Sequence, residues 1–89
     1  MVKHLNITIS GQVQGVWFRG SAKDQADKLS IKGLVKNLPN GSVHIEAEGN
    51  PEALEEFLRW CQKGPPLSQV SKVDTSPAKV RNYTEFNIL

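Results

Sequence analysis

The sequence predicts an α+β domain in which two helices cover one face of an antiparallel β-sheet. Apolar stretches that repeat every second residue alternate with two amphipathic segments of helical period. An Asn-Gly pair between two of those stretches marks a tight hairpin. The chain has 89 residues, of which 38% are hydrophobic and 22% charged. We therefore expect one folded domain, residues 1–89.

The first strand is expected over residues 3–10, where apolar and polar residues alternate. This alternation places Leu5, Ile7 and Ile9 on the buried face of the sheet. It places His4 on the opposite face, which we expect to be exposed to solvent.

A glycine-containing loop follows this strand and leads into a helix expected from about Arg19 to Ser30. Ala22 and Ala26 recur there at helical spacing. Gly20 is unusual so early in a helix, because glycine costs about 1 kcal/mol relative to alanine in a helix interior. Close approach of the backbone to a ligand would explain this glycine, and fraying of the first turn is the alternative.

The next two strands are expected to form an antiparallel hairpin around Pro39-Asn40-Gly41. Asn-Gly tolerates the positive φ angles of a type I′ turn. The alternation after the turn predicts an inward-facing set and an outward-facing set of side chains. The outward-facing set, expected to form a solvated row, is His44, Glu46 and Glu48.

A second helix is expected from Asn50-Pro51-Glu52, where asparagine caps and proline occupies the first helical position. Cys61 lies on its apolar stripe and is expected to pack in the core, and Gly64-Pro65-Pro66 ends it. Extended segments at residues 69–75 and 83–89 complete the chain. This order, strand-helix-strand-strand-helix-strand (βαββαβ) with a final extended segment, is typical of the split βαβ, ferredoxin-like arrangement.

Charge and cysteine content narrow the function classes. The formal net charge of +2 lacks the dense basic character of nucleic-acid binders and is compatible with small anionic substrates. A single cysteine excludes an intramolecular disulfide or a cysteine-built zinc site. No cleavable leader is apparent, and no stretch approaches the roughly 20 apolar residues of a membrane span. We expect a cytoplasmic monomer that binds neither nucleic acid nor membrane.

The segment from Gly11 to Arg19, which reads GQVQGVWFR, has the layout of an anion site. Small residues allow backbone N–H groups to converge, the start of a helix adds unpaired N–H groups, and a guanidinium offers a forked partner for phosphate. The loop alone is a weak signal, because an arginine at a helix start is usually only solvated.

This segment resembles the first signature of the acylphosphatases, and Gly33 to Val43, closing on Gly49, resembles their second. Pro51 to Phe57 and Gly64-Pro65-Pro66 also resemble that family's second helix and the loop after it. Two motifs in the right order are more specific than one glycine pattern, and the resemblance covers essentially the whole chain.

The resemblance implies hydrolysis of the carboxyl-phosphate bond of a small acyl phosphate, without a metal or cofactor. Arg19 would hold the phosphoryl group and Asn37 would position the attacking water. The residues expected to bind the substrate through their backbone are Gln14, Gly15, Val16, Trp17 and Phe18. Two positions depart from the family pattern: Leu34 is usually aromatic, and Trp17 is bulkier than the residue common there.

Two binding modules on the same fold are alternatives to an enzyme. An RNA-binding domain would read bases with aromatic and basic residues on the sheet, where this chain offers Glu46 and Glu48 instead. A non-catalytic phosphate sensor would have the same cradle and would differ only in turnover. Asn37 taken alone would more often bond local backbone at a strand end.

Overall fold

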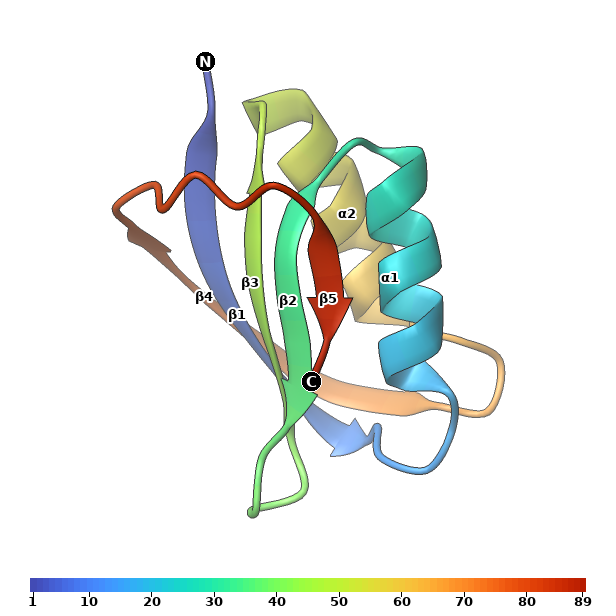
Figure 1. Cartoon of the computed structure of the whole chain (residues 1–89). Helices are drawn as coiled ribbons and strands as arrows, with labels where there is room; N and C mark the ends of the chain where they lie inside the picture. Colours follow the sequence, from blue (N-terminus) through green and yellow to red (C-terminus); the bar gives the residue numbers. More distant parts are fainter.

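The structure, a computed structural model, describes all 89 residues and forms one five-stranded sheet with two helices. Figure 1 shows both helices on the same face of the sheet. The predicted α+β, ferredoxin-like class is confirmed. The elements are β1 (Lys3–Gln12), α1 (Phe18–Lys28), β2 (Lys32–Asn37), β3 (Val43–Gly49), α2 (Pro51–Lys63), β4 (Gln69–Ala78) and β5 (Phe86–Ile88).

The sheet has the strand order β4-β1-β3-β2-β5 and is mixed. β2 pairs antiparallel with β3, as predicted for the hairpin, and β1 pairs antiparallel with both β3 and β4. β5 instead runs parallel to β2. The reason is the connection over residues 79–85, which crosses in front of β1 and β3 and enters β5 beside the start of β2 (Figure 1).

The core lies between the sheet and the two helices. Ile7, Ile9 and Val35 are fully buried on the helix-facing side of the sheet, while Leu5 is only partly buried. Cys61 is fully buried in the same cluster, and burial raises the pKa of its thiol far above the ordinary value. The predicted packing role of Cys61 is therefore confirmed. Neither helix has the length and apolar character that a membrane crossing requires.

The opposite face of the sheet is not fully exposed, which corrects the prediction for His4 and Glu48. His4 is 2% exposed and Glu48 is 3% exposed, because the segment 79–85 covers that end of the face. His4 Nδ1 lies 2.8 Å from Glu48 Oε2, and the backbone N–H groups of Arg81 and Tyr83 donate to the Glu48 carboxylate. Alternation correctly assigned these residues to one face, but it carries no information about a segment that covers that face.

The other two members of the predicted solvated row, His44 and Glu46, are partly buried. Glu46 Oε1 accepts a hydrogen bond from Tyr83 Oη at 2.7 Å. Burial and this contact with the Glu46 carboxylate raise the pKa of Tyr83. The covering segment is thus fixed to the sheet by two carboxylates that the sequence pattern had assigned to solvent.

Candidate active site

The loop between β1 and α1 turns sharply where it approaches the helix. Gly15 has φ +74°, a left-handed conformation that glycine adopts without a steric penalty, and Trp17 has φ 66° and ψ 27°. α1 begins at Phe18 with no side-chain cap and no acidic residue in its first turn. The first N–H groups of this helix have no intrahelical partner, so its N-terminus suits an anion.

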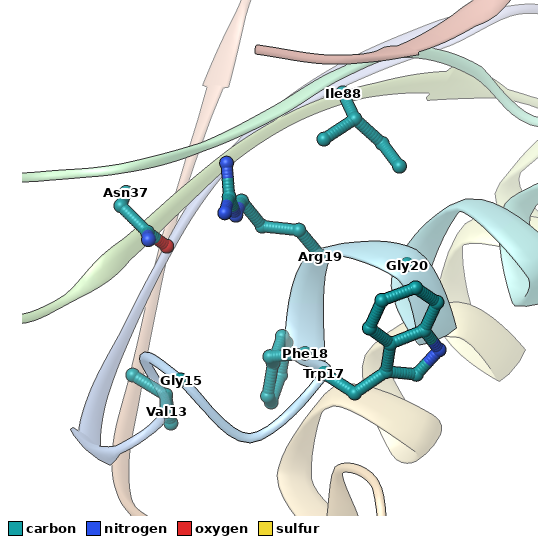
Figure 2. A pocket seen from close by; sticks show the side chains of 8 residues that line it. All are labelled: Val13, Gly15, Trp17, Phe18, Arg19, Gly20, Asn37 and Ile88. Atoms are coloured by element: carbon teal, nitrogen blue, oxygen red, sulfur yellow. The ribbon is translucent and has the colours of Figure 1, made fainter.

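Arg19 extends from the first turn of α1 into a pocket of about 290 Å³. Its Nη1 donates a hydrogen bond to the Leu89 carbonyl oxygen at 2.8 Å. A guanidinium has five N–H donors in a fixed fork, so this bond orients the group and leaves other donors for a ligand. Figure 2 shows the guanidinium extending toward Asn37.

Asn37 is the last residue of β2, is exposed, and lines the same pocket as Arg19. The pocket also brings together Gly15, Trp17 and Phe18 of the predicted set. The Phe18 side chain is only 1% exposed and belongs to the core, so its backbone is the part available to a ligand. Gly20, for which the sequence suggested close approach to a ligand, also lines the pocket, and two residues outside the predicted binding set, Val13 and Ile88, complete the lining.

Two residues of the predicted binding set, Gln14 and Val16, do not line this pocket. Val16 packs against the core. Gln14 Nε2 donates to the Leu38 carbonyl oxygen at 2.8 Å and to the Ser42 carbonyl oxygen at 2.9 Å. Its side chain therefore ties the loop to the hairpin that follows Asn37, a role the sequence pattern did not indicate.

Replacing Gln14 with glutamate is expected to loosen this tie. A carboxylate has no donor and would face two carbonyl oxygens, so the loop should move relative to Asn37. For acetyl phosphate, a small substrate of the kind that the resemblance implies, we expect kcat/KM to fall about tenfold, since small misplacements of positioning groups are costly. Steady-state kinetics, with Gln62→Glu on the exposed surface of α2 as the matched control, measures the effect. Equal kcat/KM in Gln14→Glu and the native chain would contradict it.

Gly20 is explained by a neighbouring side chain. A Cβ atom at Gly20 would lie 2.7 Å from Trp17 Cε2 and 2.9 Å from Cζ2, closer than real contacts allow. The glycine makes room for the indole, which packs on the first turn of α1. Residue 20 lies in the first turn of α1, next to the indole.

The pocket contains a single charged side chain, Arg19. No cluster of three or more His, Cys, Asp or Glu residues is arranged to hold a metal ion. Leu34, one of the two departures from the expected pattern, does not line the pocket, whereas Trp17 does. The pocket is thus lined by the start of α1, with its free backbone N–H groups, by the guanidinium of Arg19 and by the neutral amide of Asn37.

The fold and this pocket define the class as a ferredoxin-like α+β domain with one charged side chain at the start of a helix, and comparison with known proteins narrows that class to a family. The family model described as acylphosphatase matches residues 5–88. The acylphosphatase of Methylococcus capsulatus is 42% identical over 89 residues, which cover 99% of this chain and 97% of the relative. The acylphosphatase of Archaeoglobus fulgidus is 45% identical over 84 residues, 94% of each chain.

Solved structures agree with this assignment. An acylphosphatase from Coxiella burnetii matches with a TM-score of 0.96 and 35% identity, covering 99% of this chain and 93% of that one. The chain belongs to the acylphosphatase family. It is therefore a hydrolase that acts on acyl phosphates.

Proposed function

We propose that hydrolysis takes place in the pocket between the β1–α1 loop and the end of β2. Arg19 and the backbone N–H groups of the loop hold the phosphoryl group, and Asn37 positions the attacking water. The observation that carries this proposal is that Arg19 and Asn37, which come from different elements, line one pocket (Figure 2).

Arg19 supplies the positive charge that phosphoryl transfer requires. Charge in the transition state spreads over three equatorial oxygens, and catalysis depends mainly on positioning and electrostatic stabilisation. A guanidinium fork matches two of those oxygens, and the N–H groups at the start of α1 face an anion favourably.

Asn37 acts by orientation. Its amide is neutral near pH 7, so it accepts from the water through its carbonyl oxygen and donates through its nitrogen, without removing a proton. The leaving carboxylate departs without protonation, so no acid-base pair is needed. Water oxygen bonds to phosphorus, the phosphorus–carboxylate bond breaks, and the proton of the water passes to the substrate's own phosphate.

Asn37→Ala is expected to lower kcat for acetyl phosphate about 100-fold while leaving inhibition by inorganic phosphate within about twofold. The reason is that the variant loses the placed water but keeps Arg19. Kinetics with Asn87→Ala, an exposed strand asparagine outside the pocket, serves as the control. A loss of phosphate inhibition equal to the loss of kcat would show instead that Asn37 binds the phosphoryl group.

The activity itself is tested by incubating the native protein with acetyl phosphate and EDTA. We expect hydrolysis far above the spontaneous rate, with phosphate and acetate produced in equal amounts. A protein that binds phosphate without accelerating hydrolysis would be a sensor, and activity abolished by EDTA would require a metal-dependent mechanism.

The enzyme is further proposed to act as a cytoplasmic monomer without a nucleic-acid partner. The single cysteine of the chain, Cys61, is a buried free thiol, which suits a reducing compartment. The segment 79–85 covers part of the sheet face that an RNA strand would need, and Glu46 on that face would repel phosphates. Light scattering and RNA titration test these points.

A further inference from the structure

We propose that Asn40, in the turn between β2 and β3, is a site of spontaneous deamidation, and that the isoaspartyl product of this reaction impairs the pocket. The modification consumes only water and involves no ligand of the pocket, whereas its effect on turnover rests on the proposed function. Its starting point is the sequence, in which Asn40 is followed by glycine, while every other asparagine precedes isoleucine, leucine, proline or tyrosine.

Deamidation begins when the backbone nitrogen of the following residue attacks the side-chain amide carbon. The nitrogen of Gly41 gives its proton to hydroxide and bonds to Asn40 Cγ, and Nδ2 leaves as ammonia after taking a proton from water. Glycine permits the resulting five-membered succinimide, because no Cβ atom hinders the attack. Water then opens the ring at one of its two carbonyl carbons. One opening gives aspartate, and the other gives isoaspartate, in which the main chain runs through Cβ and Cγ.

The turn exposes both reacting groups and directs the side chain of Asn40 toward Gly41. Both residues are exposed and lie at the free end of the β2–β3 hairpin (Figure 1). Asn40 Oδ1 accepts hydrogen bonds from the Ser42 N–H at 3.0 Å and from Ser42 Oγ at 2.6 Å. These bonds fold the amide forward over the Gly41 peptide, and they draw electron density from the carbon that is attacked. A Cβ atom built on Gly41 meets nothing within 4 Å, so there is space for the ring.

One hydrogen bond opposes the attack. The Gly41 N–H donates to the Leu38 carbonyl oxygen at 3.1 Å, and this bond must open before the nitrogen can react. Gly41 has φ +93°, but Asn40 does not have a positive φ, so the type I′ turn expected from the sequence is not formed. A single bond at an exposed hairpin tip opens at little cost in free energy.

The two products differ in their effect on the hairpin. Aspartate keeps the length of the main chain, and its carboxylate still accepts from Ser42. Isoaspartate adds one carbon atom to the main chain between Leu38 and Ser42, which close the hairpin through a bond of 2.8 Å from the Leu38 N–H to the Ser42 carbonyl oxygen. The carbonyl oxygens of these same two residues accept from Gln14 Nε2. The extra atom therefore displaces the acceptors that hold the β1–α1 loop beside Asn37.

The test follows the native protein during incubation at mildly alkaline pH, where hydroxide is more abundant. Peptide mapping by mass spectrometry should show deamidation at Asn40 about tenfold or more faster than at Asn82 and Asn87, which are also exposed, because glycine offers no hindrance. An isoaspartate-specific methyltransferase should label the same peptide. Asn40→Ser, which keeps an oxygen that accepts from Ser42 but has no amide, should show no change of mass in this peptide.

Activity separates the effects of the two products. We expect kcat/KM for acetyl phosphate to fall in proportion to the isoaspartyl fraction, with a loss of about tenfold in the isoaspartyl form, since small misplacements of positioning groups are costly. Freshly purified Asn40→Asp reproduces the other product and should stay within about twofold of the native value, because its carboxylate keeps both hydrogen bonds. Incubated Asn40→Ser should keep its initial activity.

Deamidation at Asn40 no faster than at Asn82 and Asn87 would overturn the inference whatever the activity. Undiminished kcat/KM in the isoaspartyl fraction, or an equal loss in fresh Asn40→Asp, would overturn the effect ascribed to isoaspartate. If the native protein does not accelerate hydrolysis, the proposed function fails, and hydrogen exchange of the Leu38 N–H then decides the effect on the hairpin. Exchange should become faster in the incubated native protein and not in Asn40→Ser, and equal exchange would overturn the effect.

Discussion

Arg19→Ala is expected to lower kcat/KM for acetyl phosphate by about 1,000-fold, the largest effect of any single substitution in the pocket. An arginine that stabilises a transferring phosphoryl group contributes on the order of 10³ or more to the rate. No other charged side chain lines the pocket to replace it. Arg19→Lys should recover only a small part, because an ammonium is a point charge without the fork.

The measurement is steady-state hydrolysis together with inhibition by inorganic phosphate, which should weaken in parallel in Arg19→Ala. Urea unfolding should accompany it, since the bond from Arg19 to the Leu89 carbonyl oxygen is also lost. Arg59→Ala is the matched control, because Arg59 is exposed on α2 in an i,i+4 pair with Glu55 at 3.8 Å. Native activity in Arg19→Ala would refute the site assignment.

Glu48→Ala is expected to destabilise the fold by about 3 kcal/mol or more. The carboxylate is 3% exposed and accepts hydrogen bonds from His4 and from the N–H groups of Arg81 and Tyr83. Its removal leaves His4 and two backbone N–H groups buried without hydrogen-bond partners, and such unpaired buried groups lower the free energy of unfolding strongly. Urea unfolding at pH 7 measures the loss. Glu56→Ala on the exposed face of α2 should change stability by less than about 0.5 kcal/mol.

The same network predicts a dependence of stability on pH. Burial alone would raise the pKa of Glu48. The net effect is a lowered pKa, because the carboxylate accepts hydrogen bonds from Arg81 N–H, His4 and Tyr83 N–H and is attracted by the charge of His4. The folded state therefore binds this proton less readily than the unfolded state. The stabilisation should be complete above the ordinary glutamate pKa of 4.5 and fade as pH falls below it. A stability gap between native protein and Glu48→Gln that widened on acidification would contradict this.

Local sequence patterns were sufficient to predict most of the helices and strands. Alternation located β1 and β3, and the Asn-Gly turn located β2 as the hairpin partner of β3. Helical spacing located α1 and α2, and Asn50 caps α2 as expected, accepting from the Ala53 N–H at 2.8 Å. The parallel pairing of β5 was not predictable, because only the path of residues 79–85 sets its direction. That segment has no periodicity that would indicate what it covers, and the burial of His4 and Glu48 was missed for the same reason.

The sequence identified the candidate residues of the site, and the structure showed which of them lie together in one pocket. Arg19 and Asn37 were named from motifs, and both line the pocket. Their catalytic roles remain predictions. The tie made by Gln14 and the space that Gly20 leaves for Trp17 depend on contacts with Leu38, Ser42 and the indole ring. Neither arrangement is reflected in a periodic pattern or a motif spacing of the sequence, so neither could be predicted from it.

The short ladder between β2 and β5 has a consequence for the strand that carries Asn37. Its register ends with Val35 opposite Ile88, so the backbone of β2 at Lys36 and Asn37 has no strand on that side. An unpaired sheet edge normally invites another strand. Asn37 lies in this part of β2, opposite Val43, so its backbone is held by pairing with β3 on one side only.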